Sequence, residues 1–453
     1  MTQTAPPPLG QPVSFLSASR FWLQLGLVSF GGPAGQVALM HAELVERRRW
    51  LSERRFLHAL NYAMVLPGPE AQQLATYIGW LMHGIPGGLV AGSLFILPSL
   101  VLLIALATVY AVWGSVPALA AVFWALKPAV TAIVLQAAWR LGQRTLHNGV
   151  LIAIAVAAFV GLTLLKLAFP ALIGAAALVG WLGSRWRPDL FRSGKGHGRA
   201  AEQGLADALH GDDTPTPAHA RFSSRKLALT LLAGGLALGF PLALLAALNG
   251  WNGGLATMAR FFTQVALVSF GGAYAVLPYV TQAAVGQFHW LSAPQMIDGL
   301  ALGETTPGPL IMVVTFVGFM GGWNTPVFGA TGSWWAAVAA ALTVTWFTFL
   351  PSFVLILAGG PLVESSRDDL RLGGPLTAIT AAVVGVIVNL AVFFAGHVLW
   401  PAGATGPFDG LALAVLLAAS WVLLRWKWSV LQVIGAAALV GLLRLALQQL
   451  HLL

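Results

Sequence analysis

The stretch that decides the fold occurs twice: Arg20-Phe-Trp-Leu-Gln-Leu-Gly-Leu-Val-Ser-Phe-Gly-Gly32 and, 240 residues later, Arg260-Phe-Phe-Thr-Gln-Val-Ala-Leu-Val-Ser-Phe-Gly-Gly272. The same offset places two further islands over each other, Trp50-Leu51-Ser52 over Trp290-Leu291-Ser292 and Pro67-Gly68-Pro69 over Pro307-Gly308-Pro309. After an insertion in the second half, an offset of 253 pairs Leu97-Pro98-Ser99 with Leu350-Pro351-Ser352. Matches that keep one register indicate an internal duplication.

The composition indicates that this duplicated unit lies in a membrane. Apolar residues make up 58% of the 453 positions, charged residues 9%, and the mean hydropathy is +0.80. Soluble domains carry about 25% charged residues, whereas a bilayer solvates apolar side chains and penalises charge. The net charge of +9 comes from Lys and Arg in short polar loops, a positive-inside pattern that does not indicate nucleic-acid binding. Cysteine is absent, which excludes disulfides and thiol redox chemistry.

We therefore predict an all-helical polytopic membrane protein. Roughly thirteen apolar segments reach the length of about 20 residues that spans a bilayer. They lie near 20–44, 57–83, 86–113, 117–138, 149–167, 169–185, 227–249, 259–283, 298–321, 333–360, 376–400, 409–425 and 428–450. The predicted organisation is an N-terminal tail (1–14) that does not resemble a signal peptide, a first repeat (15–185), a polar basic linker (186–226) and a second repeat (227–453).

The two repeats are predicted to be inverted. The loop at 47–55 carries five arginines (Arg47, Arg48, Arg49, Arg54 and Arg55), whereas its counterpart at 282–295 carries no Lys or Arg. Opposite membrane faces explain this difference, and a period of roughly seven spans, an odd number, also inverts the second copy. Five single crossings between the arginine loop and the linker would, however, separate two basic regions. At least one segment must therefore be a hairpin or fail to cross.

Helix breaks recur at equivalent places in both repeats. They comprise Gly31 and Gly32, Gly271 and Gly272, Pro67, Gly68 and Pro69, and Pro307, Gly308 and Pro309. A half-helix that begins at a break offers unpaired N–H groups and partial positive charge, which suits an anion. Alternatively, the glycines permit close helix packing and the prolines only kink helices. Because the breaks are symmetric, we predict that they line a substrate cavity, with Gln72 and Gln73 either lining it too or joining helices.

Few ionisable residues lie at bilayer depth, where a charge costs at least a few kcal/mol. Glu70 follows the first Pro-Gly-Pro, and Glu304 precedes the second, at non-equivalent positions of the repeat. Carboxylates in such places bind and release protons, so we predict that both couple transport to a proton gradient. For Glu70, stabilisation of the first helical turn is the alternative.

Among the cations, Lys127 is the best candidate for an anion contact. Its flanks are apolar and its repeat counterpart is Thr380. Snorkelling of the long side chain to the membrane interface is the alternative for Lys127, and it is favoured for Arg20, Arg140 and Arg260.

The sequence favours a transporter over an enzyme, a pump or a sensor. Metal-binding His-Glu-x-x-His spacing and glycine-rich phosphate loops are absent from the sequence, so we expect no metal, no cofactor and no ATP hydrolysis by this chain alone. A membrane-embedded enzyme would need a nucleophile, metal cluster or redox site, and none is recognisable. A scaffold or sensor would need a folded domain outside the membrane, for which the linker is too short and too polar.

Three stretches resemble the chromate ion transporter family in its long, two-domain bacterial form. They are Phe30-Gly-Gly-Pro33, Asn61-Tyr-Ala-Met-Val-Leu-Pro-Gly-Pro-Glu-Ala-Gln-Gln-Leu-Ala75 and Glu304-Thr-Thr-Pro-Gly-Pro-Leu-Ile-Met-Val313. The resemblance covers the chain apart from the tail and the linker. It implies an inner-membrane protein that exports chromate from the cytoplasm, confers resistance and uses the proton motive force. The motif residues that it carries over are Gly31, Gly32, Pro67, Gly68, Pro69, Glu70, Gln72, Gln73, Glu304, Pro307, Gly308 and Pro309.

We therefore expect a secondary exporter that works by alternating access, with chromate and the lipid bilayer as partners. Sulfate is the natural competitor, because both anions are tetrahedral dianions and only a difference in contacts separates them. Transport of sulfate or another small anion is the alternative. A symmetric carrier does not fix the direction of transport, and the sequence leaves a homodimer open.

Overall fold

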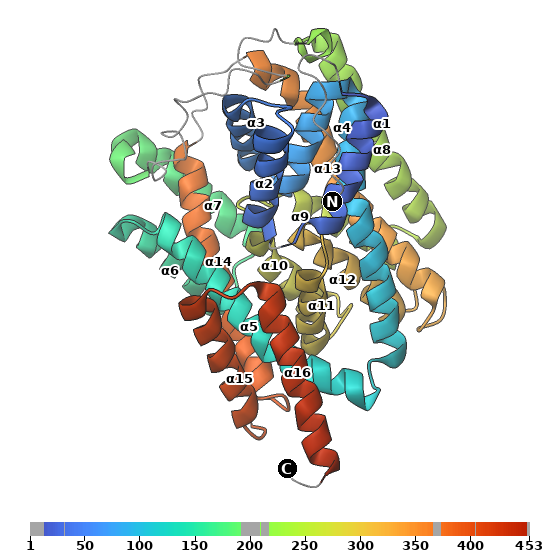
Figure 1. The fold of residues 1–453 in the computed structure, drawn as a ribbon, viewed down its shortest axis with the longest axis vertical. Helices are drawn as coiled ribbons and strands as arrows, with labels where there is room; N and C mark the ends of the chain where they lie inside the picture. The colour runs from blue at the N-terminus through green and yellow to red at the C-terminus, as the bar shows by residue number, and fades with distance from the viewer. Residues whose placement is uncertain are drawn as a thin grey trace.

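The computed structural model describes residues 13–30, 32–191, 209, 217–365, 373–403 and 405–450, and every regular element in them is helical (Figure 1). The first half contains α1 (Phe15–Val28), α2 (Gly32–His41), α3 (Glu53–Val65), α4 (Glu70–Trp113), α5 (Pro117–Thr145), α6 (Gly149–Thr163) and α7 (Phe169–Trp186). The second half contains α8 (Ser224–Asn249), α9 (Gly254–Leu267), α10 (Ala273–Thr281), α11 (Ala293–Thr305), α12 (Val313–Asn324), α13 (Trp334–Ser365), α14 (Gly373–Leu399), α15 (Gly410–Trp421) and α16 (Val430–Gln449).

The chain is a multi-pass membrane protein, but it has fewer full spans than the roughly thirteen predicted. Within the described residues, 6 helices are long and apolar enough to cross a membrane. The prediction overshot because the breaks divide apolar segments into half-length helices. At about 1.5 Å per residue, the 14 residues of α1 cover about 21 Å, which is short of a hydrocarbon core of about 30 Å.

Helix α4 is a hairpin of two helical arms rather than one rod of 44 residues. His83 and Gly84 have non-helical dihedral angles, with φ 66° and ψ −160° at Gly84. A Cβ atom added to Gly79 would lie 2.5 Å from the carbonyl oxygen of Gly87. The first arm (70–82) and the second arm (85–113) therefore lie side by side in opposite directions, at a separation that requires small residues.

Two re-entrant pairs of half-helices precede the second arm of α4. The carbonyl oxygen of Val13, just before α1, lies 2.8 Å from Nε2 of His83 at the α4 turn. Helix α1 therefore starts at the same end of the molecule as this turn. Helix α1 runs inward to the Gly-Gly break and α2 runs back, while α3 runs inward to the Pro-Gly-Pro break and the first arm of α4 runs back (Figure 1). Each pair enters and leaves by one face.

The second repeat reproduces this order of elements. The π-helical turn Gln282–Gln287 matches Ala42–Arg47, and α11 matches α3, both at the predicted offset of 240 residues. Helices α12 and α13 take the places of the two arms of α4, and residues 325–333 connect them. This connection accounts for the predicted insertion, and the duplication is confirmed.

The repeats are inverted, as predicted. Trp334 at the start of α13 donates from Nε1 to Oγ1 of Thr108, near the end of the second arm of α4, at 3.0 Å. At the other end of α13, Glu364 accepts a hydrogen bond of 2.5 Å from the Tyr77 hydroxyl, on the part of α4 that precedes the turn. Helix α13 and its counterpart therefore run antiparallel, as copies related by inversion must.

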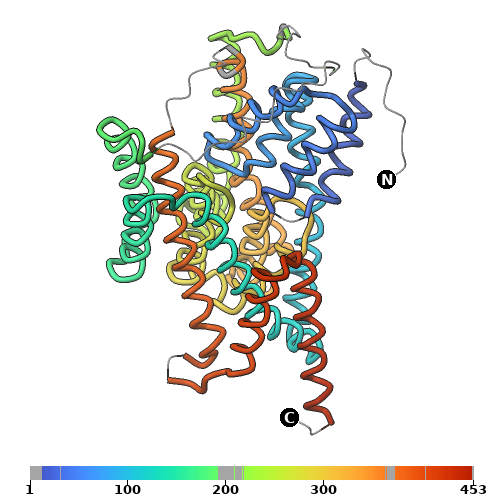
Figure 2. Tube along the Cα trace, turned by 60° about the vertical axis from the view of Figure 1, so that its left-hand side comes forward, coloured from blue at the N-terminus to red at the C-terminus, as the bar shows by residue number. Residues whose placement is uncertain are grey.

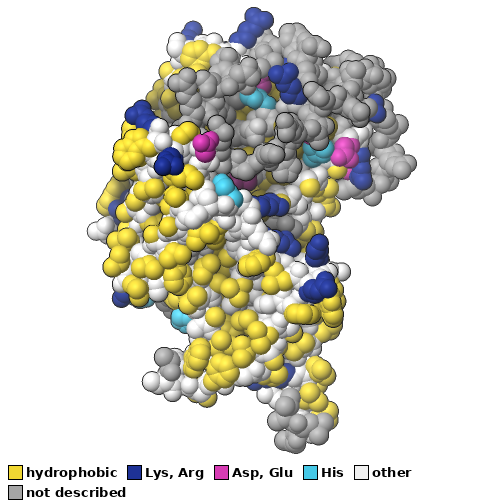
Figure 3. All heavy atoms as spheres, turned by 90° about the vertical axis from the view of Figure 1, so that its left-hand side faces the viewer, with side chains coloured by type: hydrophobic (Ala, Val, Ile, Leu, Met, Phe, Trp, Pro, Cys, Tyr) yellow, Lys and Arg dark blue, Asp and Glu magenta, His cyan; other side chains and the backbone are white. Residues whose placement is uncertain are grey.

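One end of the molecule, which we call the basic face, carries both the arginine loop (47–55) and the described part of the linker. The backbone N–H of Leu209 donates to the carbonyl oxygen of Arg49 at 3.0 Å. The two regions share a face because the predicted span 57–83 is the re-entrant pair of α3 and the first arm. The second arm and α5 then lead across and back, and α6 and α7 form a pair whose two ends lie together, with Asn148 donating to the carbonyl oxygen of Leu190 at 2.8 Å. The end with the loop 282–295 is the opposite face. In Figure 3, Lys and Arg side chains lie mainly in the upper half of the molecule, and an extensive hydrophobic surface lies below them.

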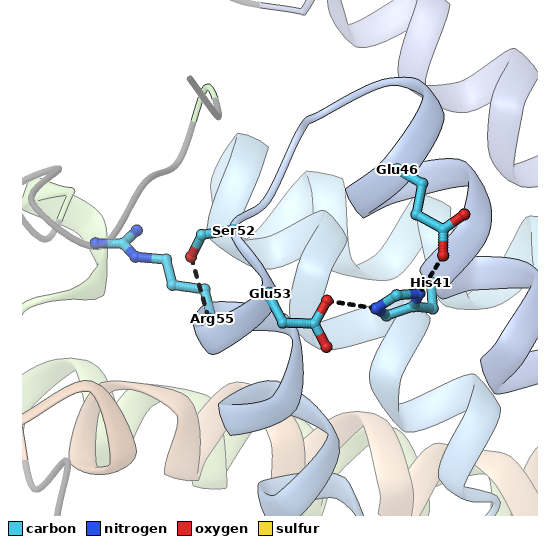
Figure 4. Close-up of polar contacts among 5 residues, drawn as sticks. All are labelled: His41, Glu46, Ser52, Glu53 and Arg55. Atoms are coloured by element: carbon cyan, nitrogen blue, oxygen red, sulfur yellow. Dashed lines mark hydrogen bonds and ion pairs between the residues drawn. The ribbon is translucent and has the colours of Figure 1, made fainter. Parts of the chain in front are cut away.

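Side-chain contacts order the arginine loop. His41 lies between two carboxylates, with Nδ1 3.1 Å from Glu46 Oε1 and Nε2 2.6 Å from Glu53 Oε2 (Figure 4). Ser52 caps α3 by accepting a hydrogen bond of 3.2 Å from the backbone N–H of Arg55, and Ser292 caps α11 in the same way. The repeated Trp-Leu-Ser islands are thus helix caps.

Helix α8 has no counterpart in the first repeat. It lies at the edge of the bundle in Figure 1 and begins at the top of the molecule in Figure 2, and Leu232, Leu236 and Phe240 on its outer side are 60%, 61% and 70% exposed. Lipid is the environment in which such a surface is stable. A Cβ atom added to Gly254, at the start of α9, would lie 3.5 Å from Val327 of the insertion. Helix α8 therefore leads from the linker on the basic face to a second copy that starts at the opposite face.

Candidate functional site

The predicted helix breaks meet at the centre of the molecule in crossed pairs. Gly68 of the first Pro-Gly-Pro donates its backbone N–H to the carbonyl oxygen of Ser269, which precedes the second Gly-Gly break, at 2.8 Å. Gly308 of the second Pro-Gly-Pro donates to the carbonyl oxygen of Ser29, again at 2.8 Å. Each Pro-Gly-Pro loop is therefore bonded to the segment before the Gly-Gly break of the other repeat. The repeats are joined where their backbones leave helical geometry and need partners.

These bonds correct one part of the predicted anion site. The N–H groups of Gly68 and Gly308 have protein acceptors, so they are not free to bind an anion. The N–H groups at the beginnings of the half-helices remain, because the first N–H groups of a helix have no acceptor within it. Helix α2 begins at Gly32, α4 at Glu70 and α10 at Ala273. Any anion attraction at the centre therefore comes from helix starts and their dipoles.

Only glycine fits the middle of the Pro-Gly-Pro loops. The φ angles of Gly68 and Gly308 are +135° and +108°, a region that residues with a Cβ atom avoid. A Cβ on Gly68 would also lie 2.2 Å from Oγ of Ser352, and one on Gly308 would lie 2.8 Å from Cβ of Ser99. These serines are the equivalent residues of the Leu-Pro-Ser islands, so this contact also crosses between the repeats.

The prolines and glutamines of the predicted site hold the loops in place. Pro69 and Pro309 occupy the cap positions of α4 and of the turn Leu310–Met312, and Pro307 precedes Gly308. Gln73 donates from Nε2 to the Pro67 carbonyl at 2.7 Å, and Gln72 donates to Thr76 at 3.0 Å. Both glutamines are 0% exposed, and the Oε1 atoms of both have no partner within the described residues. Gln73 thus fixes the loop, Gln72 bonds within α4, and the acceptor oxygens of both side chains are unused by the described residues.

The Gly-Gly breaks adopt the backbone conformation that their sequence predicts. Gly32, Gly271 and Gly272 have φ angles of +72°, +80° and +91°, which glycine adopts at little cost. Gly31 lies outside the described residues. The breaks therefore reverse the chain between half-helices and do not merely kink a continuous helix.

The two predicted proton carboxylates converge on the start of α10. Glu304, 8% exposed, accepts a hydrogen bond from the hydroxyl of Tyr274 in the first turn of α10. Glu70 has no hydrogen bond or ion pair in the described part of the chain, and its Oε1 lies 3.9 Å from the position of a Cβ on Gly272. Carboxylates near a helix N-terminus interact favourably with its dipole, and they occupy the region that would otherwise attract an anion.

Lys127 lies at the opposite face, away from the crossed breaks. Its Nζ is 3.5 Å from Oδ2 of Asp298 on α11, and the hydroxyl of Tyr110 donates to the same oxygen at 2.9 Å. A cavity of about 340 Å³ lies beside this group. Its lining consists of Tyr110, Ala111, Gly114, Ser115, Ala120, Phe123, Lys127, Gln295, Asp298, Met320, Trp323 and Asn324. Lys127 is therefore paired with a buried carboxylate and faces a pocket between the repeats.

Arg20 and Arg260 lie at the periphery, and Arg140 lies near the start of α10. Arg260 donates to the carbonyl oxygen of Trp251 at 2.9 Å and its guanidinium lies 4.7 Å from the centre of the Trp251 ring, as an interfacial anchor would. The side chain of Arg20 is exposed, and so is that of Arg140, which lies within electrostatic range of Tyr274. Within the described residues, no group of three or more His, Asp or Glu side chains could hold a metal ion.

Sequence reasoning missed Asp298, Gln36 and Tyr274. Gln36 is 0% exposed and donates from Nε2 to the carbonyl oxygen of Gly308, so it braces one crossed pair. Comparison of the repeats gave no signal for these residues, because their counterparts are chemically unrelated: His58 for Asp298, Val276 for Gln36 and Ala34 for Tyr274.

Comparisons with known proteins point in one direction. The profile of a family described as chromate transporter matches residues 16–181 and 256–442, one segment in each repeat, and omits the linker and all of α8. A chromate transport protein of Pseudomonas aeruginosa is 31% identical, over 97% of this chain and 94% of that protein. One of Cupriavidus metallidurans is 29% identical, over 93% and 91%. An uncharacterized transporter of Methanocaldococcus jannaschii is 25% identical, over 95% and 94%. No solved structure matches the chain.

Proposed function

The chain belongs to the chromate transporter family, and on this premise we propose that it is a secondary transporter that exports chromate from the bacterial cytoplasm across the inner membrane and so confers resistance. The observation that best supports this proposal is the crossed pairing of Gly68 with Ser269 and of Gly308 with Ser29. Inverted repeats that meet at broken helices near the midplane are the architecture of alternating-access carriers.

The crossed bonds suit a pivot. The two bonds are related by the inversion of the repeats. When one repeat rocks against the other about these bonds, the route from the central site to one membrane face opens while the route to the other face closes. The bonds join backbone groups of non-helical segments, so they can persist while helices tilt around them. The pocket at Lys127 then belongs to the conformation that is open towards the opposite face.

The substrate site lies at the half-helix starts, with that of α10 at its centre. A dianion there gains from the helix dipole and is repelled by ionised Glu70 and Glu304, which lie beside the same helix start. Protonation of these carboxylates removes the repulsion. This competition couples oxyanion binding to proton binding, and an anion that leaves with fewer protons than its charge still moves net negative charge outward.

The membrane potential favours outward movement of the substrate. By the positive-inside rule, the arginines of the loop and the basic linker support a cytoplasmic position for the basic face. Moving one elementary charge across the membrane is worth about 2.3 kcal/mol per 100 mV, so a potential that is negative inside drives a dianion outward. Protons that travel with the anion would reduce this driving force. Antiport of protons would increase it.

The test is uptake of labelled chromate into inside-out vesicles that contain the protein, under an imposed pH gradient and membrane potential, with and without excess sulfate. We expect gradient-dependent uptake that Glu70→Gln and Glu304→Gln each reduce, and partial inhibition by sulfate. Absence of uptake in correctly oriented vesicles that hold folded protein would exclude chromate export, and preferred uptake of sulfate would assign a different anion.

A further inference from the structure

A buried charge pair joins the two repeats at the opposite face, away from the crossed breaks. Lys127 belongs to α5 of the first repeat, and Asp298 belongs to α11 of the second. Tyr110 of the first repeat donates to the same carboxylate oxygen, Oδ2. All three residues line the cavity of about 340 Å³.

The burial of the two charged groups is unequal. The side chain of Asp298 is 3% exposed and that of Lys127 is 26% exposed. Oδ1 of Asp298 has no hydrogen-bond partner in the described part of the chain. A buried carboxylate needs its lone pairs satisfied to offset desolvation, so this ion pair is incompletely compensated. The cation reaches the cavity, while its carboxylate partner is enclosed behind it.

The cavity suits a small oxyanion. Its volume of about 340 Å³ exceeds by roughly tenfold the share of about 30 Å³ that one water molecule takes in the liquid, so a tetrahedral anion of five atoms fits with some of its hydration. Ser115, Gln295 and Asn324 add neutral polar groups to the lining. Lys127 supplies the positive charge that makes hydrogen bonds to an anion short and strong.

We propose that Lys127 binds the oxyanion at the opposite face and that Asp298 is a built-in competitor, which occupies Lys127 when the oxyanion is absent. A proton on Asp298 weakens the competitor and favours oxyanion binding. Loss of that proton restores the ion pair and displaces the oxyanion. This inference rests on the proposed function, in which the opposite face is where the substrate leaves, and it adds a site at which the pH of that face sets how readily the oxyanion leaves.

Few groups can confound a pH effect at this pocket. Among the described residues, the charged and titratable groups that act on Asp298 are Lys127 from α5 and Tyr110 from α4. Helix α12 contributes Trp323 and Asn324, which do not titrate. On α16, Arg444 lies over the ring of Trp124, at 3.7 Å from its centre.

The test is equilibrium binding of labelled chromate, and separately of labelled sulfate, to the purified full-length protein at mildly acidic and at neutral pH. Sulfate remains a dianion at both, so a change in its affinity reports on the protein. We compare the wild type with Lys127→Gln, Asp298→Asn and the double variant, which removes both charges together. Asp409→Asn is the matched control, because Asp409 bonds to Trp124 and caps α15 outside the pocket.

We expect Lys127→Gln to weaken binding by at least about tenfold, the loss typical of a hydrogen bond to a charged group. Asp298→Asn should strengthen binding at neutral pH and reduce its pH dependence to the part that Glu70 and Glu304 contribute, and the double variant should bind as weakly as Lys127→Gln. Weaker binding by Asp298→Asn with recovery in the double variant would overturn the proposal, because it is the pattern of an ion pair that only holds the repeats together.

The two proposals fail in different ways. If sulfate binds in a way that depends on Lys127 and chromate does not bind, the proposed role of Asp298 as a competitor stands and chromate is excluded as the substrate. Chromate binding that is indifferent to Lys127 and Asp298 would exclude the competitor and leave chromate export standing. Absence of binding by either anion would overturn both.

A second measurement locates the bound anion without relying on transport. The chain has no cysteine, so Ser115→Cys provides a single thiol at the rim of the pocket. We expect saturating sulfate to slow its reaction with a membrane-impermeant maleimide, and to have no effect when Lys127→Gln is also present. Equal protection in both backgrounds would contradict binding at Lys127.

Discussion

The two Pro-Gly-Pro breaks have the same backbone but different side chains. At both, the glycine N–H donates at 2.8 Å to a serine carbonyl of the other repeat, and a serine of that same repeat closes over the glycine. Around the first break, Glu70 has no partner within the described residues, while at the second Glu304 accepts from Tyr274. The shared part is the scaffold that joins the repeats, and the chemistry lies in the part that differs.

The largest effect should come from breaking the shared scaffold. Gly68→Ala and Gly308→Ala should each destabilise the protein by at least about 3 kcal/mol, because backbone strain of about 1–3 kcal/mol adds to a steric clash of similar size. The measurement is the apparent unfolding temperature in detergent. Gly271→Ala is the control, since its φ is +80° but a Cβ there would contact nothing within 4 Å. A large fall in unfolding temperature for Gly68→Ala with none for Gly308→Ala would contradict the equivalence of the two breaks.

The next effect should expose the difference between the breaks. Tyr274→Phe removes the hydroxyl that Glu304 accepts from, and leaves a buried carboxylate without that donor, at a cost of about 1–3 kcal/mol. The equivalent residue of the first repeat, Ala34, has no hydroxyl to lose. Thermal unfolding of Tyr274→Phe against the wild type measures this cost. Unchanged stability would show that Glu304 does not depend on Tyr274.

A third comparison separates transport from stability. Glu70→Gln should reduce gradient-driven chromate uptake by about tenfold or more, equivalent to about 1.4 kcal/mol, and it should leave stability within about 0.5 kcal/mol, because Glu70 has no partner to lose in the described residues. Uptake with and without a gradient, beside thermal unfolding of the same preparation, provides both numbers. A stability loss as large as that of Tyr274→Phe would favour a structural role at the start of α4.

The smallest effect is expected at the serines that close over the glycines. Ser99→Ala and Ser352→Ala should each change stability by less than about 1 kcal/mol, since no hydrogen bond of either hydroxyl is part of the crossed backbone pairs and Oγ of Ser352 has no partner in the described chain. Unfolding temperatures of the two variants test this. A loss of several kcal/mol at one serine alone would show that the symmetric contact hides different roles.

Much of the fold follows from the duplication. The offsets of 240 and 253 residues predict which helices correspond, and the asymmetry of arginines between 47–55 and 282–295 predicts the inversion. The turn in α4 at His83 and Gly84 lies at the predicted boundary between the segments 57–83 and 86–113. That the segment 57–83 is itself a re-entrant pair was not predicted, because hydropathy gives the length of an apolar stretch and not whether it folds back. The sequence required one non-crossing segment, but only the contacts identify it as the pair of α3 and the first arm.

The helix breaks were predictable because the repeats agree there, and the charged candidates Glu70, Glu304 and Lys127 were selected because they are rare in apolar surroundings. The Gly-Gly and Pro-Gly-Pro breaks were found, but their crossed bonding requires knowledge of which backbone groups meet across the repeats. Lys127 was found from its isolation among apolar neighbours. Its partner Asp298 was not, because a residue pair that exists in one half only leaves no trace in a comparison of the halves.

Helix α8 also has a consequence for how the chain is inserted into the membrane. The loop 282–295 of the second copy has no Lys or Arg, so this loop gives the insertion machinery little information about orientation. The arginine loop sets the orientation of the first copy. Because α8 crosses the membrane once, it starts the second copy at the opposite face. The orientation of the second copy is thus set by the first copy and by α8. The charge of the loops in the second copy can therefore vary as long as α8 crosses the membrane.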